Sequence, residues 1–275
     1  MRRLLLAAMM FGAVSGARAA DLPDLPVLRG GFTDDSLSRS STNWSGFYIG
    51  GQGGYGTSTE NFGGTNANLL AGLLDHNVIQ QMDVANWNLG LGKVSQHGTG
   101  FGGFAGYNWQ YDDVVVGAEM SYLHGTYGGT SIATKELVSG TALTDSFFHD
   151  VRVDSSASIQ ITDMATFRGR AGYAWGCLLP YIFGGVGFGN ANISRSVTVH
   201  DAVSATALGT FIPLQPLTAT EERHNNLIVG YSGGLGIDVS LTAGLFMRAE
   251  WEYARYTTVV DTSVNTVRLG LGYKF

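Results

Sequence analysis

The sequence has few charges, a single cysteine and no apolar stretch long enough for a membrane-spanning helix. Charged residues make up 14% of the 275, and Cys177 has no second cysteine with which to form a disulfide in the chain. Beyond the amino-terminal segment no run of about 18 apolar residues occurs, which excludes a transmembrane helix. Yet 44% of the residues are hydrophobic, too many for a disordered chain, and no Gly-x-y period indicates collagen. We therefore expect a folded protein without disulfides or membrane helices.

Glycine and aromatic residues are abundant instead. The chain contains 40 glycines, and Phe, Tyr and Trp together make up 11% of it. Low charge with many glycines and aromatics, and no spanning helix, is typical of a β-barrel that crosses a membrane with its strands.

The amino terminus has the pattern of a secretory signal peptide. Arg2 and Arg3 precede an apolar stretch over residues 4–14, and Ala17-Arg18-Ala19 forms a small-x-small cleavage site. We predict a signal peptide over residues 1–19 and an exported chain that starts at Ala20. Its removal would make the chain more acidic than its full-length net charge of −6, which argues against nucleic-acid binding.

Eight segments alternate apolar and polar residues with the period of a β-strand. Each has roughly the 10 residues that a tilted strand needs to cross the hydrocarbon of a membrane. On the fifth, Tyr181 and Phe183 fall on the polar face and blur the alternation. The segments are Gly46–Thr57, Gly98–Trp109, Val114–Leu123, Ile159–Trp175, Pro180–Gly189, Asn226–Val239, Leu245–Arg255 and Arg268–Phe275.

The connections between these segments alternate between short and long. The short ones cover residues 110–113, 176–179 and 240–244, and the long ones cover 58–97, 124–158, 190–225 and 256–263. Transmembrane barrels have short periplasmic turns and long extracellular loops. The sequence thus predicts an all-β, eight-stranded antiparallel transmembrane β-barrel over residues 45–275, preceded by a periplasmic linker over residues 20–44.

The last strand matches the signal by which bacterial outer-membrane barrels are recognised for assembly. A polar residue, a glycine and two aromatics stand at the defined positions, which are Arg268, Gly270, Tyr273 and Phe275. We expect the barrel-assembly machinery and outer-membrane lipid to be partners of the chain.

Aromatic residues collect at the strand ends, where amphipathic rings favour the membrane interface. At the outer end these are Tyr55, Phe101, Tyr122 and Tyr253. At the periplasmic end we assign to the interface Trp44, Phe47, Trp109, Tyr173 and Trp175, together with the terminal Tyr273 and Phe275.

Charged residues on the inward faces are predicted to meet in one or two neighbouring layers of the lumen. Counting from the periplasmic turns places four acids and four arginines at similar depth, where buried charges need partners. They are Glu119, Arg168, Arg170, Asp238, Arg248, Glu250, Glu252 and Arg268. Because an eight-stranded barrel is only wide enough for its side chains to fill, we expect a salt-bridged interior; the alternative is a charged constriction in a narrow pore.

Three motifs that suggest catalysis or nucleotide binding are rejected. Gly230–Gly234 reads G-x-S-x-G but lies in the middle of a predicted strand, with no histidine after His224. Gly51–Gly56 and Gly98–Gly103 read G-x-G-x-x-G but open no helix. We expect no enzyme activity, no cofactor and no metal site.

The predicted outer loops contain three further features. All six histidines lie in or beside them, without metal-ligand spacing: His76, His97, His124, His149, His200 and His224. Apolar residues between Leu69 and Met82 follow helical spacing and predict a short amphipathic helix that caps the barrel mouth or exposes a patch for a partner. Cys177, beside a periplasmic turn, is expected to be an idle buried thiol.

The opening strand Asn43–Gly56 resembles the small outer-membrane β-barrel family of alphaproteobacterial surface antigens, which is related to the OmpA-type membrane domain. Arg248–Tyr256 and Val267–Phe275 resemble the last two strands of that family. The resemblance implies an eight-stranded barrel at the cell surface with a structural or porin-like role, and haem binding for some members. We expect the peptidoglycan-binding function of OmpA to be absent.

The sequence therefore predicts an outer-membrane barrel with a structural, surface-presenting role. Two alternatives stay open, a small-solute porin and a surface receptor that takes haem or a host molecule through its loops.

Overall fold

The structure is a computed structural model that describes residues 42–242, 244–257 and 260–275. The predicted signal peptide and residues 20–41 of the predicted linker lie outside this part of the chain. Among the described residues no helix is both long and apolar enough to cross a membrane.

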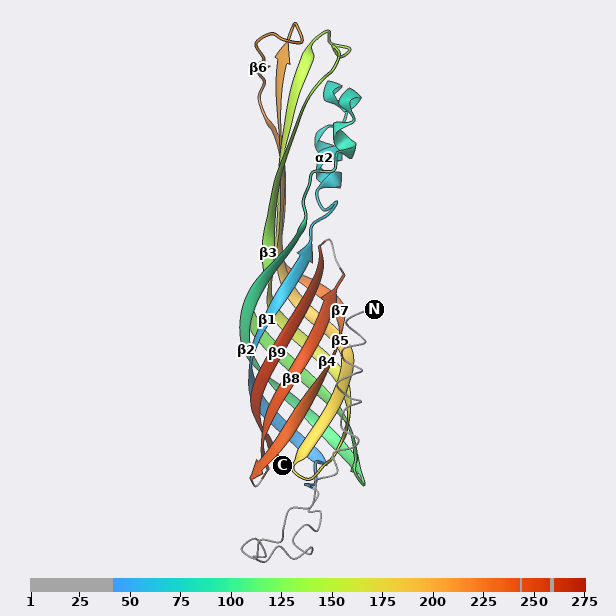
Figure 1. The fold of residues 1–275 in the computed structure, drawn as a ribbon, viewed down its shortest axis with the longest axis vertical. Coiled ribbons are helices and arrows are strands. Elements are labelled where there is room, and N and C mark those ends of the chain that lie inside the picture. The colour runs from blue at the N-terminus through green and yellow to red at the C-terminus, as the bar shows by residue number, and fades with distance from the viewer. Residues whose placement is uncertain (1–41, 243, 258–259) are drawn as a thin grey trace, which may run out of the picture. The chain divides into compact units, whose positions relative to one another are not determined.

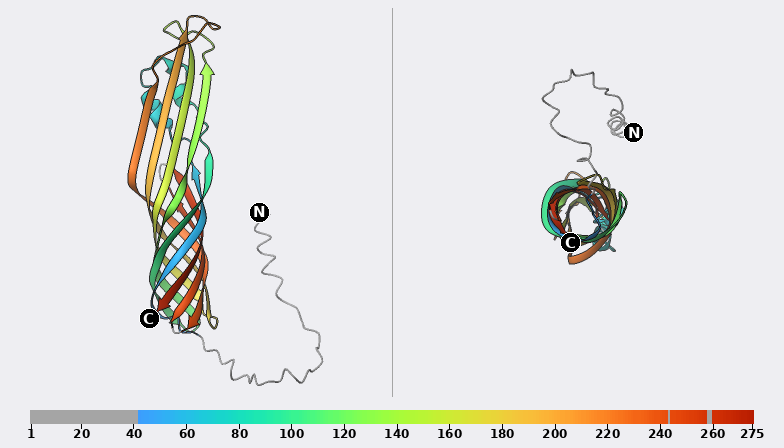
Figure 2. Two further views of the ribbon diagram at one scale, coloured as in Figure 1. Left: turned by 90° about the vertical axis from the view of Figure 1, so that its left-hand side faces the viewer. Right: turned by 90° about the horizontal axis from the view of Figure 1, so that it is seen from below.

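Eight antiparallel strands close into a ring, which the end-on view of Figure 2 shows. Each strand pairs with its neighbours in chain order, β4 pairs with β5, and β9 returns to pair with β1. The strands are β1 (Gly46–Asn61), β2 (Lys93–Tyr111), β3 (Val114–Val138), β4 (Phe148–Tyr173), β5 (Leu178–Ser204), β7 (Leu217–Thr242), β8 (Leu245–Tyr256) and β9 (Asp261–Lys274). A two-residue strand, β6 (Ile212–Pro213), pairs with the outer end of β5. The predicted eight-stranded antiparallel barrel is confirmed.

The barrel strands expose apolar side chains outward and turn glycines, polar groups and a set of buried apolar rings and chains inward. On β1, Ile49 is exposed while Gln52 is buried, and on β3 Met120 is exposed while Ser121 is buried. This order is the reverse of a water-soluble barrel and suits lipid outside and a polar lumen inside.

The prediction of loops over residues 124–158 and 190–225 is wrong, because strands occupy most of both segments. β3, β4, β5 and β7 continue past the barrel as a four-stranded sheet, which we call the blade, formed by residues 127–138, 148–161, 191–204 and 217–223. The blade rises from one side of the barrel and carries the outer hairpins at its far end (Figure 1). Alternation of Val, Ile and Ala with Ser and Thr persists along these segments, so the backbone ladders continue beyond the membrane.

A helical segment covers one face of the blade. It consists of α2 (Ala67–Leu73) and the 3₁₀ turns η3 (Val78–Met82) and η4 (Val84–Asn86). Its buried side chains Leu70 and Ile79 pack in one cluster with Val151 of β4 and Val197 of β5. The predicted amphipathic helix is thus present, but it packs on the blade rather than capping the barrel mouth, because the blade offers a longer apolar face.

Irregularities in strand register mark the base of the blade. They fall between His124 and Tyr127 on β3, between Ile161 and Asp163 on β4, and between Arg223 and Asn226 on β7. An extra residue in a strand transfers all later side chains to the other face. On β4 the even-numbered residues 164–170 are buried in the barrel, whereas the odd-numbered residues 149–161 are buried in the blade.

Two predicted placements at the periplasmic end need correction. Trp44 is only 3% exposed and packs edge-on against Phe246 inside the lumen, so it does not belong to the interface belt. Its position two residues before β1 lets the chain fold back into the barrel end. Cys177, predicted as buried, is exposed, because it sits in the tight turn between β4 and β5. Phe47, Trp109, Tyr173 and Trp175 are exposed on the outer surface.

Candidate functional site: the barrel lumen

Eight charged side chains meet in the middle of the lumen, and all are 5% exposed or less. β8 supplies three of them, since residues i, i+2 and i+4 of a strand line one face. We call this set the charge layer: Glu119 on β3, Arg168 and Arg170 on β4, Asp238 on β7, Arg248, Glu250 and Glu252 on β8, and Arg268 on β9.

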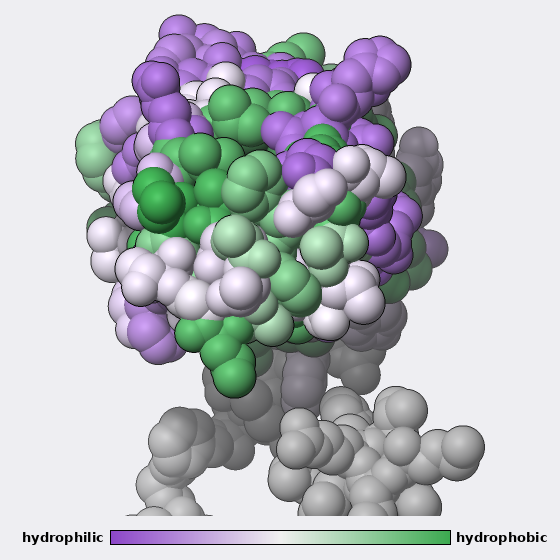
Figure 3. Space-filling view, turned by 90° about the horizontal axis from the view of Figure 1, so that it is seen from above, coloured by the Kyte–Doolittle hydropathy of each residue, from purple (hydrophilic) through white to green (hydrophobic). Residues whose placement is uncertain are grey.

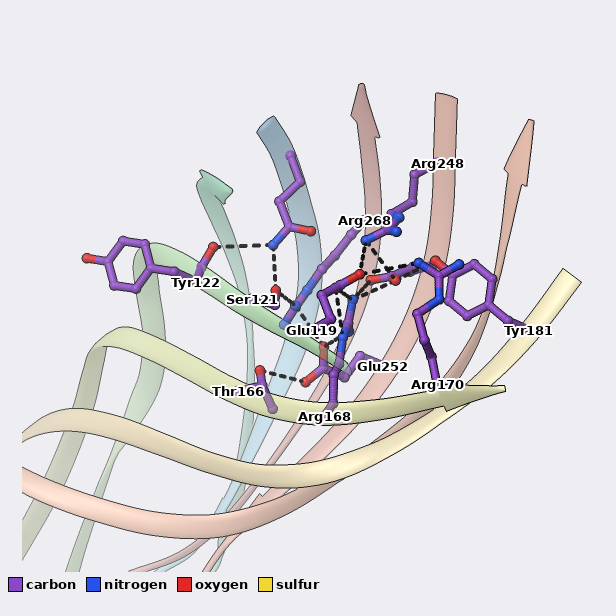
Figure 4. A network of polar contacts seen from close by, with 12 residues as sticks. Glu119, Ser121, Tyr122, Thr166, Arg168, Arg170, Tyr181, Arg248, Glu252 and Arg268 are labelled. Carbon is purple, nitrogen blue, oxygen red and sulfur yellow. Dashed lines mark hydrogen bonds and ion pairs between the residues drawn. The ribbon is translucent and has the colours of Figure 1, made fainter. Parts of the chain in front are cut away.

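Arg168 is the centre of the charge layer and contacts three carboxylates. Figure 4 shows it beside two of them, Glu119 and Glu252. Its Nε donates to Glu119 Oε1 at 3.0 Å. Its Nη2 lies 2.6 Å from Glu250 Oε1, and its Nη1 lies 3.2 Å from Glu252 Oε2. One guanidinium thus joins strands β3, β4 and β8 across the lumen.

The other arginines complete the network. Arg170 and Arg248 share Asp238, at 2.7 and 2.8 Å. Arg248 also lies 2.8 Å from Glu119, and Arg268 lies 2.7 Å from Glu252. Four guanidinium groups therefore balance four carboxylates. Buried ions are tolerated when such pairing and hydrogen bonding compensate for the loss of water.

Aromatic rings lie against three of the guanidinium groups. The guanidinium carbon is 4.0 Å from the Phe183 ring centre for Arg168 and 3.7 Å from that of Tyr181 for Arg170. For Arg248 it is 3.8 Å from the Phe104 ring centre. Cations over ring faces are favourable, more so away from water.

Tyrosine hydroxyls complete the hydrogen bonding of the carboxylates. Tyr48 donates to Glu119 at 2.7 Å, and Tyr181 donates to Glu250 at 2.5 Å. Tyr181 falls on the polar face of its predicted segment, but no role was predicted for it, and Tyr48 was not assigned to a face. Their parity along each strand, the same as that of the inward charges, was the signal that could have found them.

Inward glycines make room for the lumen aromatics. A Cβ added to Gly50 would lie 2.3 Å from the Phe104 ring, and one added to Gly272 would lie 2.3 Å from the Phe246 ring. Such distances are impossible for real side chains, so each ring occupies space that a neighbouring strand leaves open. In the same way Gly106 leaves room for the Tyr48 ring, Gly234 for the Phe183 ring and Gly236 for the Tyr181 ring. This packing explains much of the glycine content of the strands.

Apolar layers lie on both sides of the charge layer. Towards the periplasm the buried cluster includes Trp44, Val115, Leu179 and Phe246. Towards the outside Phe62 joins a second cluster of residues from β3, β4, β5, β7, β8 and β9. The charge layer is thus enclosed between two apolar layers of side chains.

Glu60 lies at the outer end of β1, above the charge layer. It is fully buried, and among the described residues neither of its carboxylate oxygens has a hydrogen-bond partner. Burial raises the pKa of Glu60 above its ordinary value, because the charged form loses the water that would solvate it.

The six histidines are distributed over β2, β3, β4, β5, β7 and the turn before η3. His149 is buried at the tip of the blade, where its ring nitrogens lie 2.9 Å from Asp201 and 3.0 Å from Asp145. His124 and His200 each contact a carboxylate of their own, Asp163 and Asp154. In the described part of the chain no group of three or more His, Cys, Asp or Glu side chains could hold a metal ion.

The three catalytic-type motifs lie within strands. Gly230–Gly234 is part of β7, Gly51–Gly56 part of β1 and Gly98–Gly103 part of β2. The nucleophile and phosphate-binding motifs both require a strand, a turn and then a helix, and none of these segments provides that context.

The terminal strand closes the ring. Arg268 points into the lumen, whereas Tyr273 and Phe275 are exposed outside, and Gly270 packs against the Phe104 ring from within. Phe275 N–H donates to Phe47 O at 2.9 Å, and the two rings lie 5.8 Å apart. The residues of the predicted assembly signal thus form the seam between the last strand and the first.

Comparisons with known proteins point to one class. The 25 kDa outer-membrane immunogenic protein of Brucella ovis is 23% identical over 67% of this chain and 68% of its own length. The 22 kDa outer membrane protein of Rhizobium leguminosarum is 24% identical over 85% of this chain and 79% of its own.

Two solved structures are similar at low levels. Ail of Yersinia pestis, solved in complex with the heparin analogue sucrose octasulfate, is 14% identical with a TM-score of 0.37, over 84% of this chain and 99% of its own. Neisserial surface protein A is 13% identical with a TM-score of 0.33, over 84% of this chain and 98% of its own.

The family model of the outer membrane protein beta-barrel domain matches residues 4–275. The chain therefore belongs to that family and is a protein of the bacterial outer membrane.

Proposed function

We propose that the protein is a closed structural barrel that holds its blade at the cell surface. The observation that carries this proposal is the charge layer, in which Arg168 ties together three carboxylates from two other strands. Such a network joins strands on different sides of the barrel wall. Its charged groups are paired with one another and are therefore not free to bind ions that pass through the lumen.

The energetics of the charge layer favour a closed lumen over a pore. A solute would have to displace a guanidinium from its carboxylates, and breaking a buried pair costs about 3–5 kcal/mol. An eight-stranded barrel has no spare width around its side chains. The apolar layers on either side would add the cost of hydrating Phe62 and Phe246.

The proposed role involves no catalysis and no cofactor. Its partners are the lipid around the apolar outer surface and the barrel-assembly machinery, which would bind the last strand before it pairs with β1. The exposed aromatic rings of Tyr273 and Phe275 support this proposal, since they remain on the outside of the seam.

Single-channel recording of the refolded protein in a planar lipid bilayer tests the closed barrel. We expect demonstrably inserted protein to give no discrete conductance steps. A variant with Arg168→Ala and Glu250→Ala, which empties the centre of the charge layer, should conduct. Reproducible steps from the unaltered protein would reject the proposal in favour of the small-solute porin.

A matched control tests whether the effect depends on the place of the ion pair in the barrel centre. Arg152→Ala with Asp154→Ala removes an ion pair on the exposed face of the blade, where Arg152 and Asp154 lie 3.1 Å apart. This control should remain silent in the bilayer.

A surface receptor is the second candidate function, and an apolar area at the tip of the blade favours it. Figure 3 looks onto this end and shows apolar residues gathered amid polar ones. Leu208 is 99% exposed and Ile212 is 66% exposed, and both lie in the connection between β5 and β7. Exposed apolar areas on soluble surfaces often mark binding sites.

Haem titration followed by its Soret absorbance tests the receptor function. Leu208→Ser with Ile212→Ser should weaken binding if the tip takes an apolar ring system. His→Ala at all six histidines should weaken binding only if an imidazole ligates the iron. No absorbance change with the unaltered protein would remove haem as a ligand.

A further inference from the structure

A polar hollow lies on the outward face of the barrel near its outer rim. Its volume is about 200 Å³, and its lining comes from β1, β2, β8 and β9. The side chains that matter here are Thr59, Lys93, Tyr253, Arg255, Asp261 and Ser263. The hollow faces away from the lumen, so the charge layer and its neighbours take no part in it.

The register of the strands fixes the height of this hollow above the lipid-facing band. Ser263 of β9 pairs with Thr59 of β1 on one side and Arg255 of β8 on the other. Four residues further down the same strands, Val267 pairs with Tyr55 and with Trp251. Four residues of a tilted strand correspond to about 10 Å of barrel height.

The character of the surface changes completely over that distance. Val267, Tyr55 and Trp251 are all large, apolar or aromatic, and exposed on the outside of the barrel. Above them the outward side chains carry hydroxyl, amide and charged groups. A polar hollow immediately above an aromatic ring is at the depth where lipid headgroups lie.

Both cations of this rim point to the same hollow. Lys93 pairs in register with Asn61, which pairs on its other side with Asp261. Arg255 is held in place by Asp261, at 3.1 Å from Nε and 2.7 Å from Nη2. The hollow therefore contains two positive charges and one negative charge, with a fixed guanidinium and hydroxyl groups beside it.

We propose that this hollow binds the phosphate of an acylated, phosphorylated lipid of the outer leaflet. The phosphate would lie between Lys93 and Arg255, with Thr59 and Ser263 donating hydrogen bonds to its oxygens. The acyl chains would run down over Trp251 and Val267. Guanidinium and ammonium groups are the usual phosphate binders, and basic pockets beside membrane-spanning elements bind anionic headgroups.

The size and position of the hollow favour a lipid over a protein partner. A volume of about 200 Å³ admits a headgroup but no side of a folded protein. The apolar band begins four residues below it on the same strands, so a ligand with both a phosphate and acyl chains gains contacts that a free anion lacks.

Native mass spectrometry of the refolded protein in neutral detergent tests the proposal. The protein is titrated with phosphatidic acid, with phosphatidylcholine and with inorganic phosphate. We expect tight retention of phosphatidic acid only. Lys93→Gln and Arg255→Gln should each weaken it about fivefold, and the double variant about 25-fold.

Two cations of the blade provide the matched control. Lys135→Gln with Arg152→Gln removes the same charge away from the rim and should leave lipid retention unchanged. The heat-dependent shift of the folded barrel on gels verifies that every variant is folded.

Three outcomes would overturn the proposal. Equal retention by the double variant and the unaltered protein would remove the two cations from any lipid site. Equal retention of phosphatidylcholine would show that the phosphate charge is not recognised. Binding of inorganic phosphate in the same concentration range, with displacement of the lipid, would assign the hollow to a free anion.

Discussion

The barrel and the blade share strands β3, β4, β5 and β7 but have opposite interiors. In the barrel the buried centre is a network of ions, and the exposed side is apolar. In the blade the buried side contains Val151, Val153, Val197 and Val199 under the helical segment. Its other face carries hydroxyl pairs such as Ser196 with Thr220 and Thr198 with Thr218.

The difference shows that the surroundings decide which face of a strand is polar. Where lipid surrounds the strands, apolar side chains lower their free energy by facing outward, and polar groups must satisfy one another inside. Where water surrounds them, the hydrophobic effect reverses the choice. Strand β4 meets both conditions along its 26 residues and adopts both patterns.

Removal of a charge from the lumen should have the largest effect on stability. Arg168→Met leaves Glu119, Glu250 and Glu252 short of a partner inside the barrel. We expect a loss of about 3–5 kcal/mol in the free energy of unfolding. Urea unfolding in detergent micelles, followed by tryptophan fluorescence, measures it.

The blade offers the matched change for that experiment. Arg152→Met breaks an exposed pair with Asp154 and should cost less than about 1 kcal/mol. Similar losses for the two variants would contradict the distinction between the two interiors.

An apolar deletion in the blade should have the next largest effect, and a local one. Leu70→Ala empties a buried position between α2 and the blade, at a cost of about 2–5 kcal/mol to the packing of that segment. Limited proteolysis should cut the segment around α2 faster, while the gel shift of the folded barrel stays unchanged. Loss of the barrel shift itself would mean that the two regions do not unfold separately.

Adding one methyl group inside the barrel should cost about 1–3 kcal/mol. A Cβ on Gly234 would lie 2.1 Å from Trp251 O and 2.6 Å from the Phe183 ring. Gly234→Ala should therefore lower the urea midpoint of unfolding. Its neighbour Gly233 faces outward with only Phe183 O at 3.6 Å, so Gly233→Ala should leave the midpoint within error.

The smallest predicted effect is the pH dependence contributed by Glu60. Because burial raises the pKa of Glu60 in the folded protein, the folded state binds a proton more tightly than the unfolded state. This contribution to stability is complete below the unfolded pKa and is lost as pH rises through the folded pKa. Glu60→Gln should remove that slope and stabilise the protein at neutral pH by about 1 kcal/mol.

Unfolding midpoints at several pH values between 4 and roughly 8 measure the slope. Glu222→Gln, on an exposed side chain of the blade, is the control and should retain it. An unchanged slope in the Glu60→Gln protein would show that Glu60 keeps its charge when buried.

Much of the barrel could be predicted because lipid imposes a strict period of two. Segments such as Val116–Tyr122 alternate without interruption, so the strand and its inward residues follow from the sequence. The depth of Glu119, Arg170 and Glu250 could be counted from the turns, because a strand advances by a constant rise per residue.

The blade was missed for a physical reason. Its strands alternate Val or Ala with Ser, Thr and Asp, which has the same composition as a polar loop when only large apolar residues are counted. Ser155, Ser156 and Ala157 give little periodic signal, although backbone pairing through them is continuous. The helical segment was visible from its spacing, but the surface that it covers was not, because that surface lies on other strands.

The lumen aromatics were missed for another reason. Tyr181 and Phe183 fell on the polar face of their segment and only blurred its alternation, and Phe104 was given no place, whereas each ring packs between a guanidinium and the backbone of a glycine. A ring that accepts a cation behaves as a polar group, and scales of hydrophobicity do not express this.

The bulges at the base of the blade have a consequence for how the chain can be altered. Each resets the inside–outside frame of its strand, and on β7 Asn225 adopts a left-handed backbone at this point. A β3–β4 hairpin of another length could therefore be grafted above Thr162, and a β5–β7 hairpin of another length above Asn225, while the barrel residues keep their register. The bulges therefore separate two parts of each strand. The blade can be exchanged for another structure while the side chains of the membrane-embedded barrel keep their inward and outward positions.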